Sequence, residues 1–220
     1  MSRVKICGLT TESDLETAVD AGADAVGIIC DVPVETPREV SLERARTLAA
    51  ATPPFVTSVL VTMATAPTRT NELVAAIEPD AVQLHGDVSR DELSALRDDL
   101  EADLLLAVAA DDVAAGENYD DLVDGFVVDS VDDEGGGGTG ETHDWDRTRE
   151  ATADLESPII LAGGLTPANV ADAVRTAEPF AVDVASGVEY EGGHKDDDAV
   201  YAFVERANRA SQTTEPTVSS

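Results

Sequence analysis

Cys7 ends a short, mainly apolar run at residues 4–7 and is followed directly by Gly8. Thiols are rare in this chain, which has Cys7 and Cys30 only. A thiolate accepts protons and attacks electrophiles, so a thiol at a strand exit, ahead of a flexible turn, suits proton transfer or nucleophilic attack. An isolated cysteine is also often a small core residue. The role of Cys7 therefore depends on what lies opposite it.

Asp129 ends another apolar run, at residues 125–129. A lone carboxyl group at the rim of an apolar barrel is expected to have a raised pKa, which suits it to giving and retaking a proton. A solvated turn residue is the alternative interpretation. If Asp129 faces Cys7, an acid and a base would bracket one substrate and move protons at two of its atoms without a cofactor.

Two glycine-containing loops follow apolar runs near the C-terminus. One holds Gly163 and Gly164, and the other holds Ser186 and Gly187. Without bulky side chains, such loops let backbone N–H groups approach an anion, and a helix N-terminus beside them adds a favourable dipole. After the last two strands of a barrel they predict a phosphate site. Tight turns that need glycine for their own conformation are the alternative.

The elements that must position these residues are visible as repeated apolar runs. Eight runs, each followed by a polar or glycine turn and then an amphipathic stretch, occupy residues 4–7, 25–30, 55–61, 81–84, 104–109, 125–129, 159–162 and 181–185. Unbroken apolar strands that alternate with helices are typical of a parallel sheet covered by helices. Eight of them with right-handed crossovers favour an α/β fold of one domain, a closed (β/α)8 TIM barrel. An open doubly wound sheet is the second possibility.

Helix signals support the same architecture. Thr11 or Ser13 can cap a helix that ends before Gly22, and Ser41 and Ser89 open two others. The stretches at residues 111–122 and 144–150 are short and poorly patterned as helices. The barrel is expected to span residues 1–210, with a disordered tail at residues 211–220 that is polar and has few apolar residues.

Composition limits the partners. The chain has 220 residues and a net charge of −31, from 45 acidic and 14 basic residues, of which only Lys5 and Lys195 are lysines. Such a surface repels nucleic acid and anionic membranes, and its self-repulsion favours a monomer over a homodimer. Many carboxylates, arginine in preference to lysine and few aromatic residues resemble proteins of salt-loving organisms, where salt screens the repulsion. We therefore expect structure to be lost at low ionic strength.

The location and the oxidation state are also constrained. The sequence shows no secretory signal and no apolar run long enough to cross a bilayer, which predicts a cytoplasmic protein. Two cysteines without metal-ligand spacing predict neither a disulfide framework nor a metal site. If the first two strands are neighbours, however, Cys7 and Cys30 could be close enough for a regulatory disulfide or a metal.

Five segments, in order along the chain, resemble phosphoribosylanthranilate isomerase of tryptophan biosynthesis. They are VKICGLT at residues 4–10, AGADAVG at 21–27, VQLHG at 82–86, LAGGLTPANV at 161–170 and PFAVDVASGVE at 179–189. The resemblance covers the chain from Arg3 to about Ala207 and is far more specific than the barrel alone. It implies an Amadori rearrangement with Cys7 as general base and Asp129 as general acid, and it implies no metal or organic cofactor.

The same resemblance implies further site residues. Arg38 matches the arginine that binds the anthranilate carboxylate, for which a planar guanidinium is well suited. Asp183 matches a residue near the phosphate, where it could hold a loop. Gln83 and His85 lie at the fourth strand, and a rim histidine is more often a hydrogen-bonding neighbour than a catalyst. Alternation along the first strand was expected to point Lys5 away from Cys7, which leaves unexplained what lowers the pKa of the thiol.

The loop after the sixth strand departs from the family pattern. It reads GGTGETHDW at residues 137–145, with Glu141 where relatives often have lysine and His143 where they have an aromatic residue. Gly138 and Gly140 still allow a loop that closes on the substrate. A carboxylate at position 141 should not contact a phosphate, so this loop is not expected to supply a positive charge.

Rival functions share the barrel. Another phosphate-binding barrel enzyme is one rival, such as a phosphosugar epimerase or indole glycerol phosphate synthase. The latter is expected to need a catalytic lysine inside the barrel, and Lys5 and Lys195 are the only lysines. A non-catalytic sensor that binds a phosphosugar without converting it is a rival from another class.

Overall fold

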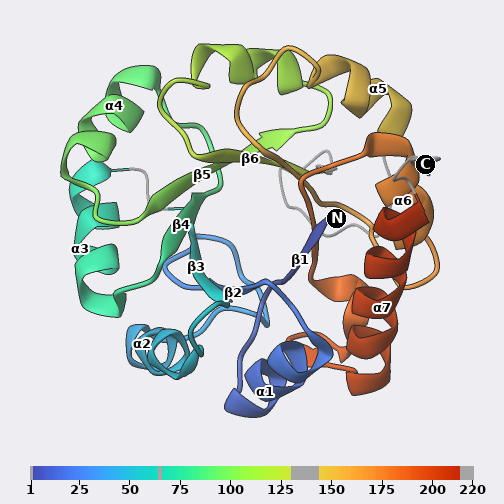
Figure 1. The fold of residues 1–220 in the computed structure, drawn as a ribbon. Helices are drawn as coiled ribbons and strands as arrows, with labels where there is room; N and C mark the ends of the chain where they lie inside the picture. Colours follow the sequence, from blue (N-terminus) through green and yellow to red (C-terminus); the bar gives the residue numbers. More distant parts are fainter. Residues whose placement is uncertain (1, 64–65, 130–143, 214–220) are drawn as a thin grey trace.

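The computed structural model describes residues 2–63, 66–129 and 144–213. Eight parallel strands form a closed barrel in the order β1 to β8, and β1 pairs with both β2 and β8. The helices surround this ring, as the view along the barrel in Figure 1 shows. The predicted (β/α)8 architecture is thus confirmed, and the open sheet is excluded.

The strands begin and end close to the predicted apolar runs. They are β1 (Arg3–Ile6), β2 (Ala25–Ile29), β3 (Thr57–Thr62), β4 (Ala81–Leu84), β5 (Asp103–Ala109), β6 (Gly125–Asp129), β7 (Ile159–Leu161) and β8 (Ala181–Val184). Residue 55, placed in the third run, lies outside the strand. Phe55 has a positive φ of 75° and is fully exposed, so its aromatic ring misled the sequence pattern.

The helices on the outside are α1 (Glu12–Ala21), α2 (Leu42–Ala51), α3 (Pro67–Ile77), α4 (Arg90–Asp99), α5 (Trp145–Ala151), α6 (Val170–Ala177) and α7 (Asp197–Thr213). Thr11 caps α1 in a capping box with Asp14, and Gly22 ends it in the left-handed conformation. The weakly patterned stretch after β5 holds only a 3-10 helix, η1 (Val113–Asn118). A second 3-10 helix, η2 (Ser186–Val188), leads into a hairpin of β9 (Glu189–Glu191) and β10 (His194–Lys195).

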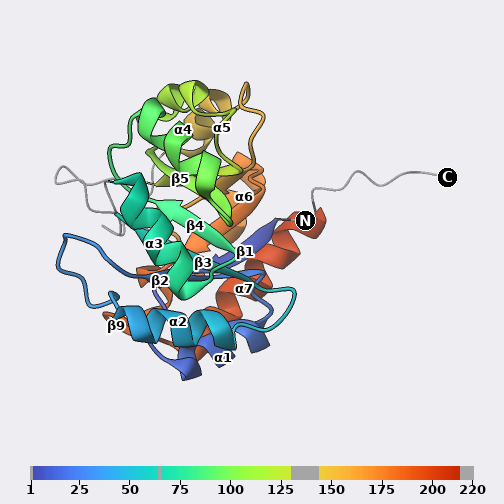
Figure 2. The ribbon, with the colours of Figure 1, turned by 90° about the vertical axis from the view of Figure 1, so that its left-hand side faces the viewer.

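The last helix extends beyond the predicted boundary at residue 210. It continues to Thr213 because Ser211 is buried, and its hydroxyl accepts a hydrogen bond from the backbone N–H of Ser2 at 2.8 Å. This contact joins the two ends of the described chain, and Figure 2 shows the N-terminus beside the end of α7. Disorder at residues 214–220 stays a prediction, because they lie outside the described residues.

Side chains alternate between two cores. Residues such as Val4, Ile6, Val26 and Ile28 point outward and join the large cluster between barrel and helices. Their neighbours in sequence point into the barrel, where smaller clusters form around Cys7 and around Val127. Because successive side chains of a strand point to opposite faces, the outward-facing apolar residues fix which residues face the barrel interior.

Three aspartates anchor strands at the end of the barrel opposite the predicted site. Asp24, Asp80 and Asp124 each precede an even-numbered strand and accept a backbone N–H from the neighbouring odd-numbered strand, at 2.8 Å in each case. Each carboxylate accepts a backbone hydrogen bond that has no acceptor on the neighbouring strand, near the point where the strand begins. No helix within the described residues is both long and apolar enough to span a membrane.

Candidate active site

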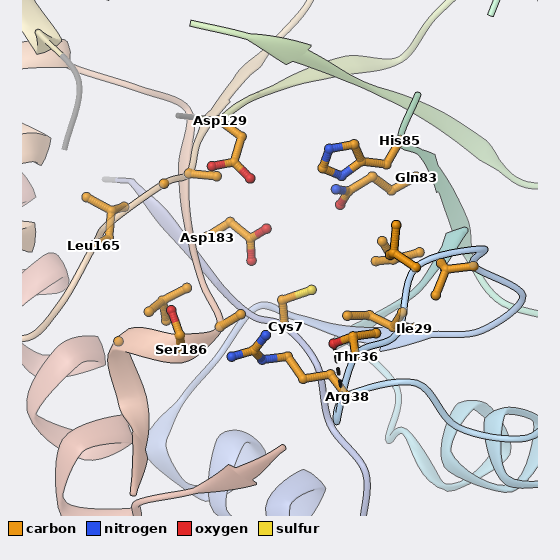
Figure 3. A pocket seen from close by; sticks show the side chains of 18 of the residues that line it. Cys7, Ile29, Thr36, Arg38, Gln83, His85, Asp129, Leu165, Asp183 and Ser186 are labelled. Atoms are coloured by element: carbon orange, nitrogen blue, oxygen red, sulfur yellow. Dashed lines mark hydrogen bonds between the residues drawn. The ribbon is translucent and has the colours of Figure 1, made fainter. Parts of the chain in front are cut away.

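A cavity of about 360 Å³ opens at the carboxyl ends of the strands. Figure 3 shows the side chains that surround it. Every candidate site residue in the described part of the chain lines this one cavity: Cys7, Arg38, Gln83, His85, Asp129, Gly163, Gly164, Asp183, Ser186 and Gly187. Gly138, Gly140 and Glu141 lie outside the described residues. The structure therefore brings together positions from six of the eight strand ends.

Cys7 directly follows β1, and its thiol faces the cavity. The sulfur fits there because position 27, on the adjacent β2, is a glycine: a Cβ at Gly27 would lie 2.5 Å from Sγ. Burial raises the pKa of the Cys7 thiol, and the Asp183 carboxylate adds to the rise, while Lys5 and Lys195 oppose it. The cavity thus holds a thiol whose ionisation depends on the neighbouring ammonium groups. Cys7 and Cys30 are both free and buried.

Lys5 lies on the same face of β1 as Cys7, which corrects the expectation that it points away. Side chains two residues apart along a strand point to the same face, so the side chains of Lys5 and Cys7 both enter the barrel. The Lys5 ammonium donates to Asp183 Oδ2 at 2.8 Å and to Gln83 Oε1 at 3.1 Å. Burial alone would lower the pKa of Lys5, but the Asp183 carboxylate and the Cys7 thiolate outweigh it, and the pKa is raised. Asp183 therefore holds a lysine of the neighbouring strand, and its expected role in holding a loop stays a prediction.

Asp129 is the last residue of β6 and reaches the cavity from the side opposite Arg38 (Figure 3). His85 follows β4 directly and faces the same space. Burial lowers the pKa of His85, with a further contribution from the charge of Lys5, so the imidazole is neutral at pH values near 7. A neutral imidazole can accept a hydrogen bond on one nitrogen and donate one from the other.

Arg38 is held by a carboxylate that the sequence did not single out. Glu189, at the start of β9, accepts from Arg38 Nε at 2.9 Å and from Nη2 at 2.8 Å. The same carboxylate accepts from Lys195 Nζ at 2.7 Å. Burial by itself would raise the pKa of Glu189, but the hydrogen bonds from Arg38 and Lys195 lower it. Within the described part of the chain, Nη1 of Arg38 makes no hydrogen bond, which leaves it available to an anion.

The two glycine loops lie side by side at the cavity. Gly187 is required by packing, because a Cβ there would lie 1.8 Å from the carbonyl oxygen of Leu165. The Asn169 side chain donates to the carbonyl of Gly164 and accepts from the N–H of Thr166, which ties the first loop to the start of α6. Among the described residues, the backbone N–H groups of Gly163, Gly164 and Ser186 have no acceptor. These N–H groups are available as donors at the cavity, and the phosphate site stays a prediction.

Three residues of the site were missed from sequence: Lys5, Glu189 and Lys195. The signal available was the lysine count, since both lysines of the chain bond to residues that line this cavity. Each of the two is only 3% exposed. In the described ranges, no group of three or more histidine, cysteine, aspartate or glutamate side chains is arranged to hold a metal ion.

Comparison with known proteins gives one consistent result. The profile of the N-(5'-phosphoribosyl)anthranilate (PRA) isomerase family matches residues 4–206. The N-(5'-phosphoribosyl)anthranilate isomerase of Natronomonas pharaonis is 60% identical over 207 residues, which cover 94% of this chain and 98% of that protein.

Two solved structures are similar over nearly the whole chain. The phosphoribosyl anthranilate isomerase of Thermotoga maritima superposes with a TM-score of 0.84 at 34% identity, covering 95% of this chain and all of that one. A phosphoribosyl anthranilate isomerase in complex with reduced 1-(o-carboxyphenylamino)-1-deoxyribulose 5-phosphate superposes with a TM-score of 0.82 at 32% identity and the same coverage.

Proposed function

Because this chain belongs to the N-(5'-phosphoribosyl)anthranilate isomerase family, we propose that Cys7 and Asp129 perform the family's reaction here as general base and general acid. The reaction is the Amadori rearrangement of N-(5'-phosphoribosyl)anthranilate to 1-(2-carboxyphenylamino)-1-deoxyribulose 5-phosphate, a step of tryptophan biosynthesis. The observation that carries the assignment is that a thiol and a carboxyl group from β1 and β6 line one cavity of about 360 Å³.

The two groups act in sequence. Asp129 gives a proton to the furanose ring oxygen, and the ring C–O bond breaks to leave a Schiff base between the sugar and the anthranilate nitrogen. The Cys7 thiolate then removes the proton from C2' of the sugar, and the electron pair moves to form an enolamine. Tautomerisation of the enolamine gives the ketose product. Each step needs one proton donor or acceptor at contact distance from the sugar.

The remaining residues are proposed to bind the substrate. Arg38 binds the anthranilate carboxylate through Nη1, since its other edge is already occupied by Glu189. Asp183 Oδ1 is buried and has no hydrogen-bond partner among the described residues, which suits it to accept from a sugar hydroxyl. Gln83 and His85 complete this wall of the cavity.

The phosphate is proposed to bind at the two glycine loops. The free N–H groups of Gly163, Gly164 and Ser186 supply donors, and Gly187 lets the second loop approach the first. The N-terminus of α6 adds a favourable dipole for a dianion. Gly138 and Gly140, outside the described residues, are proposed to belong to a loop that covers the bound substrate.

The experiment follows anthranilate fluorescence after the purified protein is added, in molar salt, to enzymatically generated N-(5'-phosphoribosyl)anthranilate. We expect the fluorescence to fall with catalytic turnover. Saturable binding of the phosphosugar with no product would instead support the non-catalytic sensor. Growth rescue of a salt-tolerant tryptophan auxotroph that lacks this isomerase provides an independent check.

We further propose that the enzyme is a cytoplasmic monomer that binds neither nucleic acid nor membranes. The net charge of −31 supports this, because like-charged copies and anionic polymers are repelled. Light scattering coupled to size exclusion in molar salt tests the monomer, and a mass near twice 22.9 kDa would contradict it.

A further inference from the structure

The distribution of lysine in this protein is unusual. Twelve of the 14 basic residues are arginines, and the two lysines are both buried. Each bonds to residues that line the cavity: Lys5 to Asp183 and Gln83, and Lys195 to the carbonyl of Ala185. Lysine is ordinarily a surface residue that is almost never buried unless paired. Arginine provides every other basic side chain of the chain, so both ammonium groups lie behind the wall of the cavity that holds Cys7. The site therefore has a use for a small point charge that a planar guanidinium would not meet.

The geometry of Lys5 is that of a charge held in place. The side chain lies on the barrel face of β1 with Cys7, and Lys5 is in register with Asp183 on β8. An ammonium has three donors. Two of them go to Asp183 Oδ2 at 2.8 Å and to Gln83 Oε1 at 3.1 Å, and Cys7 lies two residues further along the chain, on the same face of the strand. Lys5 and Asp183 are 3% and 8% exposed, so little water screens their charges.

We propose that Lys5 is a positioning residue that fixes a positive charge against the sulfur of Cys7 and so stabilises the thiolate, and that Asp183 and Gln83 orient it. The proposal rests on the proposed function, in which Cys7 is the general base. Lys5 keeps its proton throughout: Cys7 loses its proton to solvent before the reaction and takes one from C2' during it. The raised pKa of Lys5, held up by Asp183 and Cys7 against burial, keeps the ammonium charged over the working range.

Other charged or titratable groups line the same cavity or pair with residues that do. Within the described residues they are Asp183 on β8, Lys195 on β10, Glu189 on β9, Glu35 and Arg38 after β2, His85 after β4 and Asp129 on β6. Lys195 acts on Cys7 in the same direction as Lys5, and Asp183 acts in the opposite direction. Removing the positive charge at position 5 should therefore raise the pKa of the Cys7 thiol, and removing the negative charge at position 183 should lower it.

The test measures the rate at which iodoacetamide alkylates Cys7, as a function of pH and in molar salt. A Cys30→Ala background leaves a single thiol, and position 30 does not line the cavity. Lys5→Met should slow alkylation at mildly alkaline pH by at least about tenfold, the lower end of what an opposite charge at contact distance contributes. Asp183→Asn should accelerate it. Loss of packing would expose the buried thiol and speed alkylation in both variants, so opposite changes identify a charge effect.

Equal rates in Lys5→Met and the Cys30→Ala parent would overturn the proposal, and so would rates that change in the same sense in both variants. Lys5→Met leaves the Asp183 carboxylate buried without its partner and is at risk of not folding. If circular dichroism shows that it does not fold, the pH dependence of alkylation in Asp183→Asn decides: a lower apparent pKa of the thiol supports the proposal, and an unchanged or higher one rejects it. Alkylation needs no turnover. A Cys7→Ala variant with full activity would reject the proposed function without affecting this result.

Discussion

At the scale of single residues, the site depends on one thiol in an environment that resists its ionisation. Burial raises the pKa of Cys7, and two nearby lysines limit the rise. A general base must be deprotonated to act. Only a fraction of the protein molecules therefore carries the active thiolate near neutral pH, and that fraction grows as the pH increases.

The pH dependence of activity follows from this direction. Because the pKa of Cys7 lies above the ordinary thiol value of 9.0, kcat/KM should rise with pH throughout the range from 7 to 9.0, by close to tenfold per pH unit at the lower end of that range. Initial rates in molar salt at subsaturating substrate measure it. A kcat/KM that is level over this range would contradict the assignment of a buried thiol as the base.

The space for the sulfur is a second property of single residues. Gly27→Ala would place a Cβ 2.5 Å from Sγ of Cys7, so the thiol must move. We expect kcat to fall by about a hundredfold, because small displacements of a catalytic group cost that much. Gly125→Ala, in β6 and away from the cavity, is the matched control, since its Cβ would also meet neighbours at 3.2 Å. Equal activity in the two variants would show that the position of the thiol is not critical.

Residue-scale prediction from sequence succeeded for groups that follow a strand directly. Cys7 and His85 each come immediately after an apolar run, so position alone indicated the cavity. It failed for Lys5, whose partner Asp183 is 178 positions away in the chain. The alternation rule was also misapplied, because residues two apart along a strand share a face, and only the closed barrel shows that this face contains a carboxylate.

At the scale of elements, the β9–β10 hairpin connects the eighth strand to the loop after β2. Its glycines pack closely on this loop, since a Cβ at Gly193 would lie 2.4 Å from the carbonyl oxygen of Pro37. Its first residue, Glu189, binds both Arg38 and Lys195. The hairpin therefore orients the arginine that is proposed to bind the anthranilate carboxylate.

Glu189→Gln should raise KM about tenfold or more and change kcat much less. The reason is that hydrogen bonds to charged groups contribute about 1.5–3 kcal/mol, and their loss frees Arg38. Glu191→Gln, an exposed carboxylate of the same hairpin, is the control and should behave like the parent protein. Steady-state kinetics measure both. A fall in kcat with an unchanged KM would show that Glu189 does not act through substrate binding.

Elements were predictable to the extent that their side chains follow a simple period. The eight strands could be predicted, because both faces of each strand are covered and its apolar residues therefore follow one another without interruption. The hairpin was not: it has five residues in its two strands, and most of its side chains are polar. The stretch after β5 was expected to be a weak helix and contains only a 3-10 helix, which agrees with its poor pattern.

At the scale of the whole molecule, the acidic surface is the dominant property. Arginines form surface ion pairs such as Arg44–Glu12 and Arg97–Asp124. The chain nevertheless has 45 acidic residues and only 14 basic ones. The excess negative charge is not neutralised by the basic residues of the chain, and its repulsion is screened by salt. Composition was sufficient to predict this, because net charge does not depend on where each residue lies.

Dilution from molar salt into dilute buffer should therefore unfold the protein. Far-ultraviolet circular dichroism measures the loss of helix, and addition of salt should restore it. Identical spectra at both ionic strengths would contradict the prediction. Sodium sulfate at low concentration serves as a control for specific ion binding, since screening depends on ionic strength and not on the identity of the ion.

The central claim is that Cys7 and Asp129 exchange protons with one substrate held between them. Its most direct test is the turnover of Cys7→Ala and Asp129→Asn, followed by anthranilate fluorescence in molar salt. Each variant should lose at least about a hundredfold in kcat, the usual contribution of a positioned acid or base, while still binding reduced 1-(o-carboxyphenylamino)-1-deoxyribulose 5-phosphate. Turnover at the parent rate in either variant would contradict the account.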